Sequence, residues 1–147
     1  MSAGNPILER WIAETIRTYP SAAVPFLISE NDPFRNPVGH ALRQSLTNLF
    51  EQLQGNMDAS HITPALDAII RIRAVQDLTA SQAVGFVYLL KPILRELAPE
   101  HDQVRFADRV DQLALMAFDK YMQCREQLVE IRLNERLRSI PSRRAVG

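Results

Sequence analysis

The sequence has little cysteine and no excess of charge of either sign. Cys124 is the only cysteine among 147 residues, so the chain cannot form an internal disulfide and offers no cluster of thiolates to a metal. Seventeen basic residues balance seventeen acidic ones, which disfavours a protein that binds nucleic acid through a general positive field. We therefore expect no nucleic-acid partner and a reducing, cytoplasmic environment.

Long apolar runs and strand-like patterns are also absent. The longest uncharged run, Leu78 to Leu90, is too short to cross a bilayer. The sequence contains neither alternating β-branched segments nor the Asn-Gly and Asp-Gly pairs of tight hairpins. The hydrophobic fraction of 46% is sufficient for one core at this length. These features predict a single all-α domain without membrane insertion.

Prolines and polar capping residues divide the chain into helices. Asn5-Pro6, Asn36-Pro37 and Thr63-Pro64 each place a proline directly behind a capping residue, which is typical of a helix start. Thr79 and Gln82 have the spacing of a capping box. Apolar spacing then predicts a bundle of about five to six helices. The expected helices cover 6–19, part of 21–34, 37–54 with a left-handed cap at Gly55, 64–75, 79–97 with a bend near Pro92, and about 100–139.

The last segment, Glu100 to Ser139, has no proline or glycine and keeps helical periodicity throughout. One helix of this length would measure about 58 Å, whereas a compact domain of this size is on the order of 40 Å across, so the helix should project. Its first half has a broad apolar face that includes Phe106, Leu113 and Phe118. Its second half continues as a narrower seam suited to a partner helix. The residues expected to form this interface are Tyr121, Cys124, Leu128 and Ile131.

This projection divides the chain into three parts. We expect a helical regulatory domain over 1–122, a protruding interface segment over 123–140, and a flexible tail over 141–147. Residues 125–144 contain six arginines and three glutamates, so this end carries a charge of +3. The seam predicts a homodimer or a complex with a signalling protein.

The sequence contains few groups suited to catalysis. His40, His61 and His101 are isolated from one another and from cysteine, so we expect them at the surface and predict no metal site. Glycine-rich phosphate loops and nucleophile elbows are absent. Cys124 falls on the apolar seam, where a buried, inert thiol is expected. We therefore predict a non-catalytic protein without a cofactor.

A polar stretch from Arg71 to Ala83 lies between apolar segments. Within it, Arg73 and Asp77 are four residues apart and can pair at the end of one helix. One interpretation is a hydrogen-bonded corner between two helices, whose side chains satisfy free backbone groups. Together with Phe34-x-Asn36-Pro37-Val38-Gly39, the stretch resembles the N-terminal domain of RsbRD-type RsbT co-antagonist proteins. The residues of the resemblance are Asn36, Pro37, Arg73, Gln76, Asp77, Ser81 and Gln82.

The resemblance implies a sensory or regulatory input module, which in that family is joined through a helical linker to a STAS output domain. By analogy with related input domains, it also implies a globin-like arrangement without haem. This sequence stops about where the linker would meet the STAS domain. The phosphorylatable residue of that domain is therefore not expected here.

Two functional hypotheses remain at this point. The first is a non-catalytic signalling module that acts through its C-terminal helix. The alternative is a small-molecule or haem sensor with a pocket between the segment 89–97 and its neighbours. An enzyme, or an adaptor that binds nucleic acid through the C-terminal arginines, ranks below both.

Overall fold

The computed structural model describes residues 5–76 and 78–140, and within these residues it contains helices and no strand. The predictions of an all-α domain and of a long C-terminal helix are confirmed, and the structure shows that this helix is continuous. Asp77 and the tail 141–147 lie outside the described residues. The elements are α1 (Pro6–Ile16), α2 (Val24–Ser29), α3 (Pro37–Gln54), α4 (Ala59–Val75), α5 (Ala80–Val84), the 3-10 turn η2 (Gly85–Val87), α6 (Leu90–Leu97) and α7 (Glu100–Ser139).

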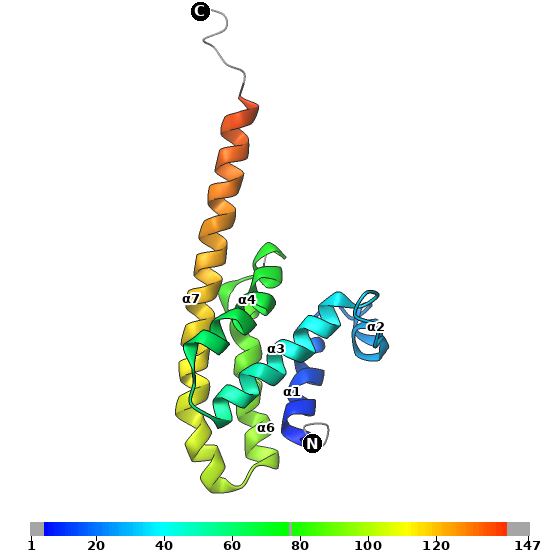
Figure 1. Cartoon of the computed structure of the whole chain (residues 1–147), viewed down its shortest axis with the longest axis vertical. Helices are drawn as coiled ribbons and strands as arrows, with labels where there is room; N and C mark the ends of the chain where they lie inside the picture. The colour runs from blue at the N-terminus through cyan, green and yellow to red at the C-terminus, as the bar shows by residue number, and fades with distance from the viewer. Residues whose placement is uncertain (1–4, 77, 141–147) are drawn as a thin grey trace, which may run out of the picture.

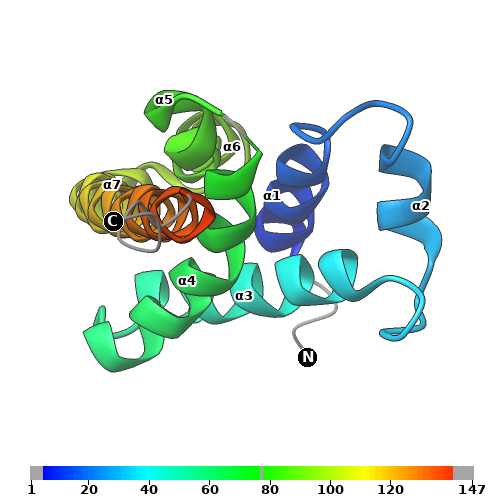
Figure 2. The same ribbon diagram turned by 90° about the horizontal axis from the view of Figure 1, so that it is seen from above.

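The helices gather along the first part of α7, and the remainder of α7 extends beyond them (Figure 1). Helices α3, α4, α5 and α6 all contact α7, while α1 packs on α3 and α6. Helix α2 lies on the side of the body away from α7 (Figure 2) and has no buried residue. The body is therefore assembled against one side of its longest helix.

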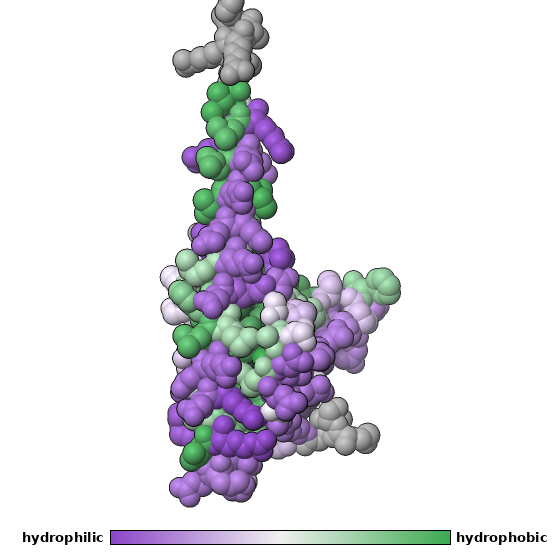
Figure 3. Space-filling model, turned by 60° about the vertical axis from the view of Figure 1, so that its left-hand side comes forward, coloured by the Kyte–Doolittle hydropathy of each residue, from purple (hydrophilic) through white to green (hydrophobic). Residues whose placement is uncertain are grey.

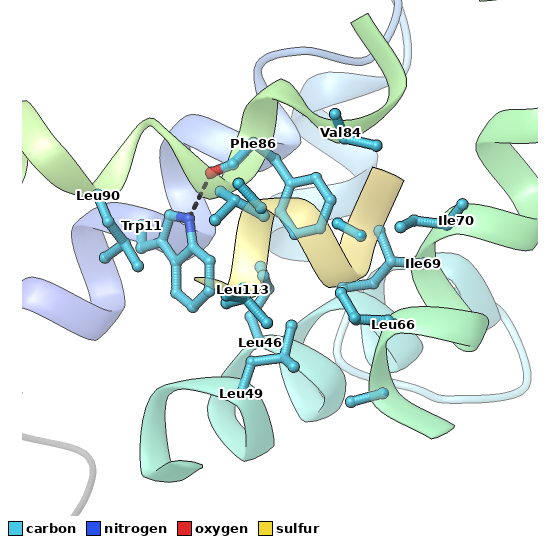
Figure 4. Packing of buried hydrophobic residues seen from close by; sticks show 14 of the residues in the cluster. Trp11, Leu46, Leu49, Leu66, Ile69, Ile70, Val84, Phe86, Leu90 and Leu113 are labelled. Atoms are coloured by element: carbon cyan, nitrogen blue, oxygen red, sulfur yellow. Dashed lines mark hydrogen bonds between the residues drawn. The ribbon is translucent and has the colours of Figure 1, made fainter. Parts of the chain in front are cut away.

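Trp11 is fully buried in the core, beside Phe86 and Leu90 (Figure 4). Its ring stacks on Phe86 with 6.3 Å between ring centres, and its Nε1 donates a hydrogen bond to the Phe86 carbonyl at 2.8 Å. Phe86 belongs to η2, where a 3-10 turn replaces regular α-helix. The indole thus satisfies a backbone carbonyl at an interruption in the helix.

This interruption corrects the expectation of one helix over 79–97 with a bend near Pro92. The helix breaks at Gly85–Leu89, and α6 begins at Leu90. Pro92 therefore lies in the first turn of α6, where its missing N–H leaves no helical bond unmade.

Two of the three proline starts are confirmed. The Asn5 side chain accepts hydrogen bonds from the backbone of Ile7 at 3.0 Å and of Leu8 at 3.2 Å. The start at Thr63-Pro64 was wrong: α4 begins at Ala59, and Pro64 lies inside it. Asp58 caps this earlier start because its carboxylate accepts from the Ser60 N–H at 3.0 Å.

Two smaller boundaries also differ. Helix α1 ends at Ile16 and continues as turns to Tyr19. Gly55 has φ of −107°, so it is not the expected left-handed cap; the positive φ of this loop, 53°, belongs to Met57. The left-handed backbone conformation therefore occurs two residues after the glycine at which it was expected.

Asn36 joins α2 to α3. Its Oδ1 accepts from the Gly39 N–H at 2.9 Å and caps α3. Its Nδ2 donates to the carbonyls of Leu27 at 3.1 Å and of Glu30 at 3.0 Å, at the end of α2. A Cβ on Gly39 would lie 2.3 Å from the Asn36 side chain, so this close approach requires glycine. These contacts account for the Asn36-Pro37-x-Gly39 pattern.

Replacing Asn36 tests this junction. Asn36→Ala should lower the free energy of unfolding by about 2–3 kcal/mol, because it removes a cap and leaves two partly buried carbonyls without their donor. Asn5→Ala removes only a cap and should cost about 1 kcal/mol. Urea denaturation followed by circular dichroism measures both changes, and equal losses in the two variants would contradict the role of Nδ2.

Candidate interaction surface on the C-terminal helix

The inward face of α7 forms one wall of the core. Its buried residues recur three or four positions apart, as the sequence pattern predicted. They are Phe106, Val110, Leu113, Ala114, Ala117, Tyr121 and Cys124.

Polar side chains of α7 also hold the carboxyl ends of two other helices. Arg109 donates to the Leu53 carbonyl at 2.6 Å, at the end of α3. Arg125 donates to the Ala74 carbonyl at 2.9 Å, at the end of α4. The last carbonyls of a helix lack helical partners and carry partial negative charge, so guanidinium groups stabilise them. These contacts determine where α7 lies on the body.

The polar stretch after α4 forms a buried corner around Arg73, whose side chain is 2% exposed. The guanidinium carbon lies 5.0 Å from the ring centre of Tyr19 and 5.3 Å from that of Phe86. Its Nη2 donates to Thr18 Oγ1 at 2.7 Å, and its Nη1 to the Gln82 carbonyl at 3.3 Å. Arg73 therefore connects α1, α4 and α5 through neutral partners and aromatic faces.

The next part of this stretch caps α5. The Thr79 hydroxyl accepts from the Gln82 N–H at 3.3 Å, and the Gln82 side chain accepts from the Thr79 N–H at 2.9 Å. Ser81 Oγ lies 3.3 Å from Thr79 Oγ1. Gln76 is the residue that follows α4. The expected capping box is thus present.

The motif residues separate into two groups. Asn36 and Pro37 form the α2–α3 junction, while the structure brings Arg73 and Gln82 together at the second corner. Asp77 lies outside the described residues, so its pairing with Arg73 stays a prediction. The contacts of the described motif residues hold helices together.

The three histidines are exposed, and the described part of the chain contains no group of three or more metal-binding side chains. Several surface clefts adjoin α4 or α7 in the described part of the chain. A cleft of about 480 Å³ at the Arg73 corner is lined by Thr18, Tyr19, Pro20, Arg73, Gln76 and Leu78. A second, of about 460 Å³, lies between α4 and α7. A third, of about 250 Å³, lies beside Cys124 and Leu128.

The end of α7 lies beyond the body, and every residue from Val129 to Ile140 is exposed (Figure 1). The four residues of the predicted interface differ in how far the chain itself buries them. Tyr121 and Cys124 are buried by the chain itself, Leu128 is half-buried, and Ile131 is exposed. Only Leu128 and Ile131 are open to a second molecule in this conformation.

A second apolar face of α7 was missed by the sequence analysis. At 100° per residue, seven exposed apolar side chains from Leu115 onward fall within about 60° of one line along the helix, roughly opposite the buried face. Figure 3 shows apolar side chains on the projecting part of the helix among polar ones. We call these residues the outer stripe: Leu115, Phe118, Met122, Val129, Leu133, Leu137 and Ile140.

Phe118 corrects one expectation directly. It was predicted to broaden the face that packs on the body, but it is 43% exposed and lies on the outer stripe. The spacing of the stripe, at three, four or seven residues, was available in the sequence. The inward seam alone accounts for a helix packed on a body, so its pattern does not by itself indicate a second apolar face.

Charged residues border the outer stripe on its projecting part. By helical position, Glu130 lies along one edge and Arg132 and Arg136 lie along the other, while Glu126 falls within the stripe, between Met122 and Val129. All four side chains are exposed. The surface therefore has an apolar centre that Glu126 interrupts, with Glu130 on one edge and two arginines on the other.

Residues 5–136 match the protein family described as the RsbT co-antagonist protein rsbRD N-terminal domain. The chain belongs to this family. The rsbRD N-terminal domain is a regulatory domain, and the matched range includes most of the projecting part of α7. Comparison with curated proteins and with solved structures found no match, so the globin-like arrangement stays a prediction. No helix among the described residues has the length and apolar character needed to span a membrane.

The reactivity of the Cys124 thiol tests whether the inward face of α7 is buried in this rsbRD N-terminal domain. Burial raises the pKa of its thiol above the ordinary value, which lowers the thiolate fraction at neutral pH. Its reaction with Ellman's reagent at pH 8 should be at least about tenfold slower than in unfolded protein. Cys124→Ala with Ser139→Cys supplies an exposed thiol as a control, and equal rates for the two thiols would contradict the burial of Cys124.

Proposed function

We propose that this rsbRD N-terminal domain is a non-catalytic signalling input module that acts in the cytoplasm by contact between proteins. In this proposal, residues 1–122 form the regulatory body and residues 123–140 carry the contact. The observation that carries the proposal is the projecting end of α7, where every residue from Val129 to Ile140 is exposed and several are large and apolar.

The energetics of this segment favour a partner. An isolated helix of about 12 residues is marginal in water, since most helical stability in proteins comes from packing of an apolar face. Val129, Leu133 and Leu137 receive no such packing from the body, because each is more than half exposed. A second helix laid along the outer stripe would supply it.

The connections of α7 to the body provide a route for a signal. Tyr121 donates a hydrogen bond from its hydroxyl to the Leu78 carbonyl at 2.7 Å, and Arg125 bonds Ala74 at the end of α4. A change at the Arg73 corner would therefore act on α7 close to where it leaves the body. Because α7 is a single helix, a displacement there would also move its projecting end.

A small-molecule sensor is the second candidate. The cleft of about 480 Å³ at the Arg73 corner falls in the size range of ligand pockets and adjoins Leu78, which Tyr121 contacts. The haem form of this candidate has no such support, because His40, His61 and His101 are all exposed.

Substitution within the outer stripe tests the proposed contact. Tagged wild-type protein recovered from cells should retain a second copy or another protein, and Leu133→Asp should lose it, because a carboxylate within an apolar interface has no partner. Asn134→Asp adds the same charge at the neighbouring exposed position and should retain it. Circular dichroism should show the same helicity and melting of the body in both variants.

Two outcomes would contradict the proposed function. One is a wild-type protein that is monomeric at micromolar concentration by light scattering and retains no protein from cells. The other is equal retention by the Leu133→Asp and Asn134→Asp variants.

A further inference from the structure

We infer that the cleft at the Arg73 corner binds a small organic anion, a carboxylate attached to an apolar body. This inference rests on the second candidate of the proposed function and deepens it, because it names the class of ligand for that cleft. Six residues from α1, α4 and the segments that follow them line the cleft: Thr18, Tyr19, Pro20, Arg73, Gln76 and Leu78. The cleft therefore combines one cationic side chain with polar and apolar neighbours.

Arg73 is a buried cation that has no carboxylate partner among the described residues. Its side chain is 2% exposed, and the ion pairs of these residues do not include it. Its hydrogen bonds reach neutral groups, Thr18 Oγ1 and the Gln82 carbonyl, and its Nε is shielded from solvent without a partner. Because a buried charge is costly without an opposite charge, this corner favours an anion.

A second buried polar group lies beside this cation. The Tyr19 side chain is 9% exposed, and its hydroxyl makes no hydrogen bond with the described residues. The Arg73 guanidinium carbon lies 5.0 Å from the centre of the Tyr19 ring, so the two side chains are adjacent in the wall of the cleft. Buried polar groups are normally hydrogen-bonded, so two unsatisfied groups at one cleft indicate a ligand that would satisfy them.

The side chains of the cleft determine the chemistry of this ligand. A guanidinium is a donor only, so the ligand must supply acceptor oxygens, and a carboxylate matches the planar guanidinium through two parallel hydrogen bonds. The bonds to Thr18 and Gln82 leave donors of Arg73 available for both oxygens. Tyr19, Pro20 and Leu78 supply apolar contact, which favours a carboxylate with an apolar body over a bare inorganic anion.

The wall of the cleft is also connected to α7. The Leu78 carbonyl accepts a hydrogen bond from the Tyr121 hydroxyl at 2.7 Å. Arg73 belongs to the last turn of α4, where Arg125 donates to the Ala74 carbonyl. A ligand that moves Arg73 or Leu78 would therefore act on α7 close to the start of its projecting end.

Calorimetric titration with matched probes tests the class of ligand. Benzoate carries a carboxylate on an apolar ring, benzamide is a neutral molecule of nearly the same shape, and inorganic phosphate is an anion without an apolar body. The wild-type protein should bind benzoate at least about tenfold more tightly than benzamide, because hydrogen bonds between two charged groups are the stronger ones. It should also bind benzoate more tightly than phosphate. Hexanoate, an aliphatic carboxylate, provides a second probe of the same class.

Substitutions locate the binding. Arg73→Met removes the charge and should weaken benzoate binding at least about tenfold, while apolar replacement of a buried charge often leaves a protein folded. Tyr19→Phe removes only the hydroxyl and should weaken binding about three- to tenfold. Arg71→Met makes the same change at an exposed position outside the cleft and should leave binding unchanged. Circular dichroism shows whether each variant is folded.

The Nε–H resonance of Arg73 gives a readout that does not depend on a variant of this residue being folded. In ¹H–¹⁵N spectra of the wild-type protein, benzoate should shift this resonance to lower field, because Nε gains a charged acceptor. The Arg71 Nε already donates to Asp67 at 3.2 Å, so its resonance should not move. Benzamide should shift neither resonance to the same extent.

Several results would overturn this inference. One is a wild-type protein that binds neither benzoate nor hexanoate at about 10 mM. Another is benzamide or phosphate binding as tight as that of benzoate, or benzoate binding that is unchanged in both Arg73→Met and Tyr19→Phe. A third is benzoate binding that appears only after Asp77→Asn, because Asp77 would then be the resident partner of Arg73.

These outcomes are independent of the test of the proposed contact, because the probes do not involve the outer stripe. A contact sensitive to Leu133→Asp in a protein that binds no carboxylate would overturn the inference and support the proposed function. Benzoate binding that depends on Arg73, in a protein without such a contact, would support the inference and contradict the proposed contact.

Discussion

The attachment of α7 to the body is the interaction on which the rest of the structure depends. Its buried side chains close the core, and two of its arginines, Arg109 and Arg125, hold the carboxyl ends of α3 and α4. Hydrogen bonds require a particular geometry, whereas apolar burial is non-directional and would by itself allow α7 to rotate about its own axis. Together they determine which face of α7 is covered and which face is left in water.

The exposed face follows from this attachment. One helix that carries apolar residues on two opposite sides can satisfy only one of them within a single small body. Once Val110, Ala117 and Cys124 are covered, Val129 and Leu133 remain in solvent. The association that we propose is therefore a consequence of the fold and does not require a separate binding domain.

Two of the polar residues on which the predicted resemblance rested have a structural role in the contacts described here. Asn36 holds the end of α2 against the start of α3, and Arg73 joins three helices between two aromatic rings. Buried polar groups of this kind must find their partners in one arrangement, so they favour a specific packing over other compact ones.

The sequence alone determined the features that depend on neighbouring residues: the caps at Asn5, Asn36 and Thr79, the great length of α7, and its buried seam. These rest on bonds between residues two to four apart, or on one repeating period. Only the tertiary structure decided the break at Gly85–Leu89, where distant Trp11 takes the Phe86 carbonyl, and the outward position of Phe118. Both are settled by partners far away in the chain, which local spacing does not specify.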